Sequence, residues 1–538
     1  MVLSAHLPGN LNPTVYPSKP IGAGPFPEFQ LGAQSKRYLP TQYPVGVCIS
    51  GGGPRSYSAA IGQMRGLTAI LGNVLGMVGA ISCVSGGAWF GTAFSYVPTS
   101  IGDDELLGPL IAPAKLTRND VDLIGVGNLG APLLRLTNEA IISDEGYYQF
   151  KVLEGDLPEN RVYSRIIGDR LLAPWGLDDP SVFFSLDGIP GLASYTVRPN
   201  RPYFIANATQ IYPDDETGIL RHIEYSPLYC GTSQLFTTDL PFGLPFGGGY
   251  VSSFGFDSIT PLSPSNPTTV QTPDPIFTLS DIMGSSGAAP GGYLDQIGLP
   301  DVGLPEFNYW PPANMGQIHS YQYSMVDGGL LEDTGIVALL RRQYPFIIAF
   351  VNAELPIGST SDQAVDGISE QVSRLFGLNP ADTDGNNQDT QVFGATKQEG
   401  QALFARLAAG LKASQYSGAT FADTYTIYPD NSFAIPPYPQ EKSPPYRGGG
   451  EVRVLWGYLN FNRDWFNAIT NPYVRNLLST YDFSNFPNYN TVFQNFGELL
   501  LLTTPQIQLL AHMTAFCVAG GKSGEMFAAF HKEVTDQM

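Results

Sequence analysis

The feature that most constrains this chain is an apolar strand that turns into a helix through three consecutive glycines. Val45–Ile49 (VGVCI) is apolar throughout and β-branched at three of five positions, which predicts a short buried strand. Apolar residues then recur at helical spacing, at Ile61, Met64, Leu67 and Leu71. Glycines at such a junction let backbone N–H groups point at a ligand near the helix N-terminus. A tight turn carrying a surface arginine is the alternative interpretation.

A second strand-to-helix junction follows about thirty residues later. Met77–Val84 is an apolar strand candidate, Ser85-Gly86-Gly87 comes next, and a helix is expected to begin near Ala88. A serine in this position has the form of a nucleophile elbow, in which the hydroxyl stands on a sharp turn at a helix N-terminus. The usual pattern is G-x-S-x-G, and Cys83 replaces the first glycine here. Serines beside glycines are also common in ordinary turns.

A carboxylate is the candidate for the base that a serine nucleophile needs. Asp327 in SMVDGGLLED follows an apolar strand candidate and precedes two glycines. We expect it at the C-terminal end of a buried strand, at the edge of a parallel sheet where α/β sites form. A desolvated aspartate can take the serine proton directly, without a histidine. A simple Asp-Gly turn would have the same sequence.

A triad of Ser85, Asp327 and His512 is the competing arrangement. Its chain order suits an α/β-hydrolase, but that fold runs through several strands before its nucleophile, and only one strand–helix unit precedes Ser85 here. His512 also lies in an apolar helix candidate, where a packed, hydrogen-bonded histidine is the commoner case. The chain has five histidines: His6, His222, His319, His512 and His531. We therefore prefer the Ser–Asp dyad.

Charge and composition exclude several classes of protein. The net charge of −20 argues against nucleic acid as a partner and against constitutive attachment to anionic membranes. No secretory signal is visible, and four scattered cysteines form no disulfide framework, so a cytoplasmic location is expected, with peripheral membrane contact left open. No charged residue occurs between Arg65 and Asp103, which is long enough to span a bilayer, but its glycines, serines and proline favour buried soluble elements. The sequon at Asn207 falls in an apolar strand candidate.

The composition indicates an N-terminal segment followed by one domain that carries two insertions. Residues 1–44 are rich in proline and glycine and are expected to run extended over the surface, ahead of a single domain at 45–538. Within that domain, about 232–316 is rich in proline, glycine and serine with interleaved aromatics, which predicts a lid or cap insertion. A polar insertion is expected at about 358–400.

Several motifs in order resemble the catalytic domain of cytosolic group IV phospholipases A2 and fungal lysophospholipases (phospholipases B), within the patatin-like superfamily. These are G-G-G-x-R after the first strand, S-G-G-x-W after the second, and D-G-G after a later one. The blocks IEYSPLYCG and VDGGLLEDTGIVALL, the latter followed by FIIAFVNAE, are also similar to blocks of that group. The motifs span roughly Val45 to Glu354. Three departures stand out: Cys83 in the elbow, Pro54 before the arginine, and EDTGI without the Asn and Pro often found after D-G-G.

The resemblance implies an α/β, patatin-like three-layer fold with a central, mainly parallel sheet flanked by helices. It implies a phospholipase A2 or lysophospholipase that cleaves fatty-acyl esters through an acyl-enzyme, without cofactor or metal. Ser85 would be the nucleophile, Asp327 the base, Gly52 and Gly53 the oxyanion hole, and Arg55 the ligand of the substrate phosphate. The expected partners are a phospholipid or lysophospholipid and, transiently, a membrane or micelle surface. A catalytically silent lipid-binding protein, or an esterase or acyltransferase for another acyl substrate, are the alternatives.

Overall fold

The computed structural model describes most of the chain. The described residues are 7–17, 26–31, 38–71, 76–136, 138–212, 219–236, 246–259, 261–263, 265–288, 303–310, 312, 320–379, 391–414, 418–428, 450–491 and 502–538. The described helices are α1 (Gly53–Leu71), α2 (Gly86–Tyr96), α3 (Asp103–Leu107), α4 (Arg118–Asp122), α5 (Asn138–Glu154), α6 (Val162–Leu171), α7 (Leu279–Ser286), α9 (Ile336–Arg341), α10 (Glu370–Ser373), α11 (Lys397–Ala413), α12 (Arg463–Ala468), α13 (Pro472–Leu477), α14 (Thr504–Ala519) and α15 (Gly521–Gln537).

The strands of the central sheet are β2 (Val15–Pro17), β3 (Val45–Ile49), β4 (Val78–Val84), β7 (Tyr203–Tyr212), β8 (Ile219–Tyr225), β9 (Tyr229–Phe236), β10 (Phe246–Ser252), β12 (Glu306–Tyr309), β13 (Tyr321–Asp327), β14 (Phe346–Val351), β17 (Thr420–Thr426) and β18 (Glu451–Tyr458). Short two-stranded pairs lie outside it: β1 (Asn10–Leu11) with β11 (Val270–Gln271), β5 (Phe183–Ser185) with β6 (Ser194–Thr196), and β15 (Ala364–Val365) with β16 (Ile368–Ser369).

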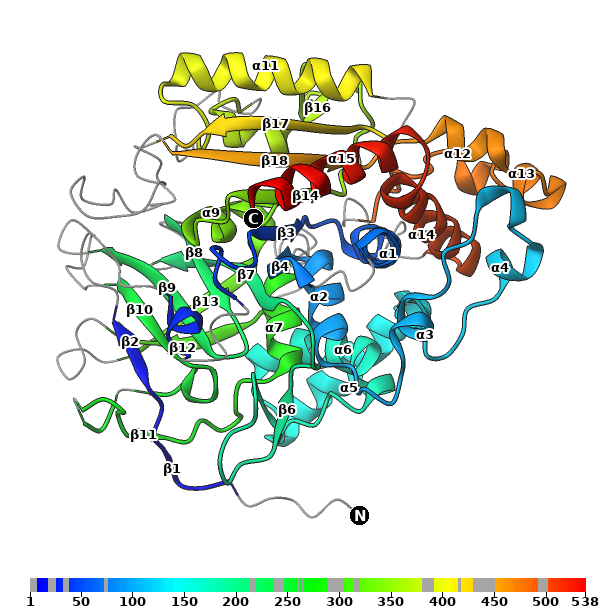
Figure 1. Cartoon of the computed structure of the whole chain (residues 1–538). Helices are drawn as coiled ribbons and strands as arrows, with labels where there is room; N and C mark the ends of the chain where they lie inside the picture. Colours follow the sequence, from blue (N-terminus) through cyan, green and yellow to red (C-terminus); the bar gives the residue numbers. More distant parts are fainter. Residues whose placement is uncertain are drawn as a thin grey trace.

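The central sheet is parallel in its middle and antiparallel toward both edges. Its order is β17-β18-β14-β3-β4-β7-β8-β9-β10-β2, with β18, β14, β3, β4 and β7 mutually parallel. Strand β17 pairs antiparallel at one edge, and β8, β9, β10 and β2 extend the other edge antiparallel. Helices lie on either side of this sheet (Figure 1). The predicted α/β class with helices flanking a central sheet is confirmed, and the sheet is mixed rather than uniformly parallel.

The sheet separates two hydrophobic cores, and successive residues of its strands enter opposite ones. In β3, Val47 and Ile49 belong to one core and Cys48 to the other; Ile348 and Ala349 of β14 divide in the same way. Cys48 and Cys83 are free and buried in this packing, where they act as small hydrophobic residues. This alternation is what strands covered on both faces require, and it produces three layers.

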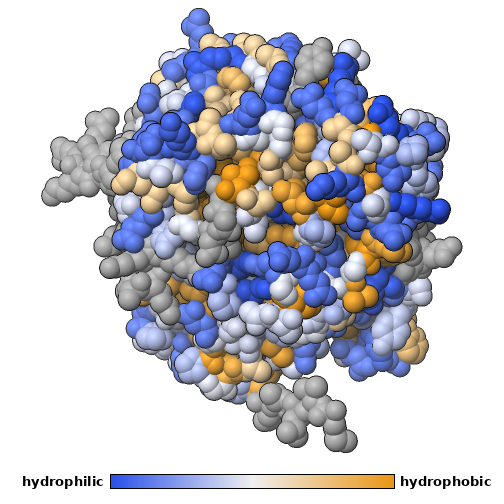
Figure 2. Space-filling view, turned by 45° about the vertical axis from the view of Figure 1, so that its right-hand side comes forward, coloured by the Kyte–Doolittle hydropathy of each residue, from blue (hydrophilic) through white to orange (hydrophobic). Residues whose placement is uncertain are grey.

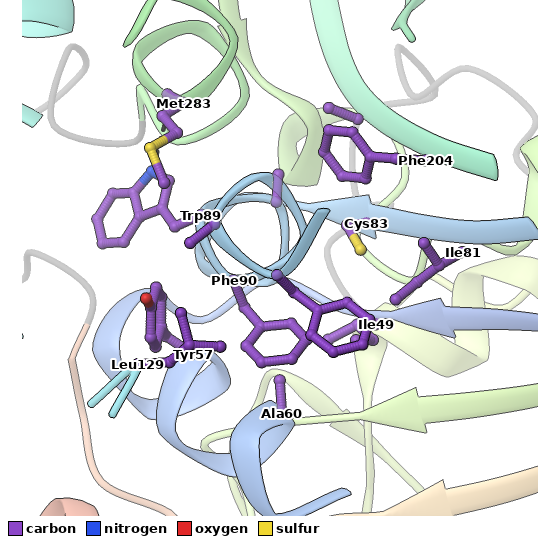
Figure 3. Close-up of a cluster of buried hydrophobic side chains, with 14 of the residues drawn as sticks. Ile49, Tyr57, Ala60, Ile81, Cys83, Trp89, Phe90, Leu129, Phe204 and Met283 are labelled. Atoms are coloured by element: carbon purple, nitrogen blue, oxygen red, sulfur yellow. Dashed lines mark hydrogen bonds between the residues drawn. The ribbon is translucent and has the colours of Figure 1, made fainter. Parts of the chain in front are cut away.

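Helix α2 lies in the first core, directly after the elbow serine. Figure 3 shows this helix end-on, with Phe90 toward Ile49 and Trp89 beside Met283 of α7. The Trp89 indole N–H donates to the carbonyl of Met283 at 3.0 Å, so the buried ring leaves no polar atom without a partner. The small residues of GGAWFGTAF let the helix pack closely on the sheet beneath it.

One edge of β7 is shared by two strands that arrive from opposite directions. Strand β8 pairs with Ala206–Tyr212 along the other edge. Along the remaining edge, β4 pairs in parallel with β7 as far as Asn207. From Ala208 onward, β13 pairs antiparallel with the same edge. Asp327 therefore does stand at the end of a buried strand, but that strand is antiparallel to its neighbour, contrary to the expectation of a parallel edge. The C-terminal ends of β4 and β13 therefore meet head to head along β7.

The predicted elements around both junctions are confirmed. Strand β3 has the expected bounds, α1 covers the helical pattern, and α2 begins at Gly86, two residues before the predicted start. Asn207 is buried inside β7, as its apolar setting indicates. The chargeless stretch contains the end of α1, and β4 and α2. Among the described residues, none of the helices combines the length and apolar character needed to cross a membrane.

The described part of residues 232–316 differs from the expected irregular lid. Residues 246–252 form strand β10, which pairs with β9 and with β2 of the N-terminal segment. Residues 279–286 form α7, which is buried throughout. The glycine run of β10 takes positive φ at Gly247 to Gly249, where the register shifts, and this lets the strand bend while it stays in the sheet. Residues 237–245, 260, 264, 289–302, 311 and 313–319 lie outside the described residues.

The terminal and polar segments also join the fold. In the N-terminal segment, β1 and β2 are short strands; β2 joins the central sheet beside β10, and Leu11 and Val15 are buried rather than on the surface. The segment 358–400 contains β15, β16, α10 and the start of α11, and its residues 380–390 lie outside the described residues. Toward the C-terminus, β17 and β18 complete the sheet, and α14 packs along α1 (Figure 1). Figure 2 shows one face of the molecule, where hydrophobic residues gather around its middle among hydrophilic ones.

The packing of α1 on α14 depends on Gly62. A Cβ at this position would lie 2.0 Å from the carbonyl oxygen of Ala511 and 2.2 Å from Oγ1 of Thr514. We expect Gly62→Ala to lower the free energy of unfolding by about 1–3 kcal/mol, despite a helix-propensity gain of up to about 1 kcal/mol. Chemical denaturation measures this change. Gly76→Ala is the control, because nothing lies within 4 Å of its Cβ position, and an equal loss there would contradict the packing argument.

Candidate active site

Ser85 stands on a strained turn between β4 and α2. Its φ of 51° and ψ of −125° lie outside the regions that serine normally adopts, as a nucleophile elbow requires. The following glycines permit close approach: a Cβ on Gly86 would lie 2.1 Å from the carbonyl oxygen of Gly53, and one on Gly87 2.6 Å from that of Ile49. The elbow therefore packs directly on the first glycine-rich junction.

The substitution of Cys83 for the first elbow glycine is accommodated by a glycine elsewhere. A Cβ on Gly91 of α2 would lie 2.7 Å from the Cys83 sulfur and 2.6 Å from the Phe204 ring. Figure 3 shows the Cys83 and Phe204 side chains on this side of α2. In the usual motif a glycine on the strand leaves room for the helix. Here Gly91 on the helix leaves room for the Cys83 side chain on the strand.

Asp327 contacts the serine directly. The Ser85 hydroxyl donates to Oδ2 of Asp327 at 2.7 Å, and the N–H of Gly329 donates to Oδ1 at 2.7 Å. Both side chains are almost completely buried, with 7% of Ser85 and 5% of Asp327 exposed. The two residues that the sequence analysis selected from segments 242 positions apart are brought into hydrogen-bond contact.

The buried setting changes the acidity of Asp327. Burial raises the pKa of Asp327 from 3.8 to about 6, and the hydrogen bonds from Ser85 and Gly329 act in the opposite direction. The carboxylate is therefore ionised at neutral pH, yet it is a stronger base than an exposed aspartate. A pKa close to the working pH is what an effective general base needs.

The first glycine-rich junction lies against the elbow. Gly52 and Gly53 both have positive φ, 123° and 53°, which glycine adopts without strain. The hydroxyl of Thr491 donates to the carbonyl of Gly52 at 2.7 Å and fixes the loop. Within the described part of the chain, neither the N–H of Gly52 nor that of Gly53 donates a hydrogen bond to another residue. Two donors thus remain available beside Ser85.

Arg55 lies on the first turn of α1 and is almost fully buried, with 1% exposed. Its Nε donates to the carbonyl of Asn352 at 2.8 Å, and its Nη1 donates to the carbonyl of Tyr489 and lies 3.9 Å from Oε2 of Glu354. Burial lowers the pKa of Arg55 from its usual value. Its Nη2 lies against Gly52, where a Cβ would come within 2.5 Å, and no hydrogen-bond partner of Nη2 is found among the described residues.

A polar cavity of about 590 Å³ adjoins the residues that hold Arg55. Glu354, which pairs with Arg55, lines it together with Asn488 and Asn490, the neighbours of Tyr489. Its remaining walls come from residues 355–356 and 361–363 after β14, from Asn460 and Phe461 after β18, and from residues 484–486. The carboxyl ends of β14 and β18 lie at the same sheet edge as the elbow. Arg55 therefore contacts both the glycine loop and the wall of a cavity large enough for a small polar group.

Among the described histidines, His222 and His512 bind other partners and do not complete a triad with Ser85 and Asp327. One ring nitrogen of His512 lies 3.2 Å from Nη1 of Arg65 and the other 3.3 Å from the carbonyl of Asp120. His222 is bound between Asn207 and Arg341. Burial lowers the pKa of each to about 3, so both are neutral at physiological pH. His6 and His319 lie outside the described residues.

Three residues of the site escaped the sequence analysis. The Ser286 hydroxyl accepts the N–H of Ser85 at 3.0 Å and donates to the carbonyl of Asn207 at 2.6 Å. The Asn207 amide donates to the carbonyl of Cys83 at 2.9 Å. Asp333 accepts the N–H of Gly51 on Oδ1 at 3.1 Å. Two of them carried a signal: Asp333 lies in the EDTGI stretch that departs from the related motif, and Asn207 is a polar residue inside an apolar strand candidate. Ser286 lies in an unremarkable context.

The arrangement provides the parts of acyl-transfer chemistry. A hydroxyl on a strained turn, a buried carboxylate in contact with it, and two nearby backbone donors suit attack on an ester carbonyl. Among the residues that the structure describes, no group of three or more His, Cys, Asp or Glu side chains could hold a metal ion.

Three solved structures of human GIVD cytosolic phospholipase A2 resemble the chain. They have TM-scores of 0.46, 0.44 and 0.43 and sequence identities of 11%, 13% and 11%. The second is a complex with methyl γ-linolenyl fluorophosphonate and terbium chloride, and the third a complex with the fluorophosphonate. They cover 94–95% of this chain, which spans 62% of the solved chains. No family model matches the chain, and no curated protein is significantly similar to it in sequence.

The raised pKa of Asp327 has a measurable consequence for stability. The native state holds this proton more tightly than the unfolded chain, so the stability present below about pH 4 is lost as the pH rises to about 6. Because asparagine does not ionise, Asp327→Asn does not lose this stability as the pH rises. We expect the variant to gain stability relative to the native protein as the pH rises through this window, on the order of 3 kcal/mol.

Denaturant unfolding of both proteins from pH 4 to pH 8 tests this expectation. Asp156→Asn is the control, because the Asp156 carboxylate lies on the surface, 60% exposed, where it pairs with Lys151. A stability difference between Asp327→Asn and the native protein that does not vary with pH would show that Asp327 titrates normally.

Proposed function

We propose that the chain is a serine acyl hydrolase that cleaves fatty-acyl esters of phospholipids or lysophospholipids. The observation that carries this proposal is the 2.7 Å hydrogen bond from the elbow hydroxyl of Ser85 to the buried carboxylate of Asp327. The order of the motifs along the sequence supports the lipid substrate. Phospholipase A2 and lysophospholipase activities, both within a patatin-like mechanism, are equally compatible with this site.

The reaction begins with attack by Ser85. Its Oγ bonds to the ester carbonyl carbon while its proton passes to Oδ2 of Asp327, which holds the hydroxyl in position. The carbonyl oxygen becomes an oxyanion and accepts hydrogen bonds from the N–H groups of Gly52 and Gly53. A donor of this kind contributes about 3 kcal/mol to the transition state. The intermediate then collapses, the ester C–O bond breaks, and Asp327 returns the proton to the leaving alkoxide.

A water molecule completes the cycle. Asp327, again ionised, takes a proton from water, and the resulting hydroxide attacks the acyl carbon of the acyl-enzyme. The bond to Ser85 Oγ breaks and the proton returns to Ser85, which releases a fatty acid. The cycle uses no cofactor or metal.

Arg55 supplies the proposed link to phospholipids. A glycerophospholipid carries its phosphate a few bonds from the scissile ester, and Nη2 of Arg55 lies beside Gly52 of the oxyanion loop. Because Nε and Nη1 bind backbone carbonyls, a phosphate would meet Nη2, which also packs against Gly52 of the loop. The adjoining polar cavity would then receive part of the head group. Transient contact with a membrane or micelle, in the cytoplasm, belongs to this proposal.

A catalytically silent lipid-binding protein is the alternative from another class. The contact between Ser85 and Asp327 and the available N–H donors of the glycine loop disfavour it, since binding alone requires neither. An esterase or acyltransferase for a phosphate-free substrate would use the same dyad and differs only in the role of Arg55.

Loss of either dyad residue should abolish turnover. We expect Ser85→Ala to lose covalent labelling by a fluorophosphonate probe, and Asp327→Asn to lose about four orders of magnitude or more in kcat on a phospholipid in mixed micelles. Ser95→Ala, on the same helix α2, should keep full activity and labelling. His512→Asn should also retain turnover; if it were as inactive as Ser85→Ala while still folded, the triad would replace the dyad.

Arg55→Lys separates phosphate recognition from support of the loop. Lysine keeps the charge but loses the fork of donors, so hydrolysis of a phospholipid should fall tenfold or more. Hydrolysis of a nitrophenyl acyl ester, which has no phosphate, should fall much less. Equal losses on both substrates, measured as kcat/KM, would mean that Arg55 only shapes the glycine loop and would favour the phosphate-free esterase.

A further inference from the structure

A second carboxyl group lies beside the dyad without a role in the mechanism above. Asp333 follows Asp327 by six residues, in the segment between β13 and α9. Its Oδ1 accepts the N–H of Gly51 at 3.1 Å, and its backbone carbonyl accepts the same N–H at 3.0 Å. Asp333 therefore holds the first glycine of the loop that supplies the proposed oxyanion donors.

Two glycines place this carboxyl close to both members of the dyad. A Cβ on Gly51 would stand 2.1 Å from Oδ1 of Asp333 and 3.0 Å from Cβ of Ser85. A Cβ on Gly329 would stand 2.8 Å from Oδ1 of Asp333 and 3.1 Å from Oδ1 of Asp327. No side chain separates these groups, because the residues between them are glycines.

The charged groups that face Asp333 make a second negative charge unfavourable here. Burial has the largest effect and raises the pKa of Asp333 well above its ordinary value, and the neighbouring carboxylates of Asp327 and Glu332 raise it further. Arg55 and the N–H of Gly51 both lower the pKa of Asp333, but by less. Two close carboxyl groups of this kind lose their protons in succession rather than together.

We propose that Asp333 is a positioning residue that holds the glycine loop while its own carboxyl group is protonated and Asp327 is ionised. Ionisation of Asp333 at alkaline pH then ends activity. This inference rests on the proposed function. The physical reason is electrostatic: the tetrahedral intermediate places a negative charge at Gly52 and Gly53, next to the loop residue that Asp333 binds. A charged Asp333 opposes that developing charge in a setting of low dielectric.

The rate should therefore depend on pH through both carboxyl groups. It should rise through about pH 6 as Asp327 ionises, and fall at higher pH as Asp333 ionises. Each limb changes by about tenfold per pH unit where a single ionisation governs it. Covalent labelling of Ser85 by a fluorophosphonate reports this dependence without the contribution of product release.

The test compares pH profiles of the labelling rate for the native protein and three variants. Asp333→Asn keeps an oxygen that can accept the N–H of Gly51 but cannot ionise, so the alkaline fall should disappear. Asp333→Ala should also lose the alkaline fall, with kcat on a phospholipid lowered about two- to tenfold and KM little changed. Glu332→Gln removes the adjacent carboxyl group but leaves Asp333 intact, so this variant should keep the alkaline fall.

The outcomes distinguish the two proposals. An unchanged alkaline limb in Asp333→Asn, or a native profile without an alkaline limb over the range in which the protein is folded, overturns the role of Asp333. The second result needs no variant, so the inference stays testable even if Asp333→Asn does not fold. If labelling persists in Ser85→Ala, the proposed function itself fails, whatever the pH profiles show.

Discussion

The site depends on the edge of β7 that two strands share. Strand β4 occupies this edge as far as Asn207 and β13 occupies it from Ala208, because β8 already fills the opposite edge. Each strand must end where the other begins, and this brings Ser85 and Asp327 together. Asn207 sits at the meeting point, and its amide and carbonyl bind the elbow through Cys83 and Ser286. Backbone pairing, rather than a particular side-chain contact, therefore sets the distance between the two groups.

The sequence predicted those parts of the site that are encoded locally. The two strand–glycine–helix junctions are short patterns whose meaning depends on neighbouring residues, so Ser85 and the loop glycines could be identified from them. Asp327 was identified for a similar reason, as a carboxylate directly after an apolar strand. The direction of that strand was not predictable, because pairing of β13 with β7 depends on segments more than a hundred residues apart.

The remainder could not be predicted because its physical causes are distant. The glycine-rich segment of β10 has the composition of a loop, and only the neighbouring strands β9 and β2 make it part of the sheet. Thr491 binds the glycine loop and Tyr489 binds Arg55, both from the C-terminal part of the chain, where no motif marked them. Ser286 belongs to a helix inside the expected lid. Hydrogen bonds across such separations have no signature in local periodicity.

Burial explains how this site could work without a histidine. An exposed aspartate is too weak a base to take a serine proton efficiently at neutral pH, whereas burial raises the pKa of Asp327 to about 6. The hydrogen bonds from Ser85 and Gly329 limit that rise, so the carboxylate remains charged at neutral pH. The same burial has the opposite effect on His222 and His512, whose pKa values fall to about 3. A low dielectric thus favours the carboxylate as base and keeps these two imidazoles neutral.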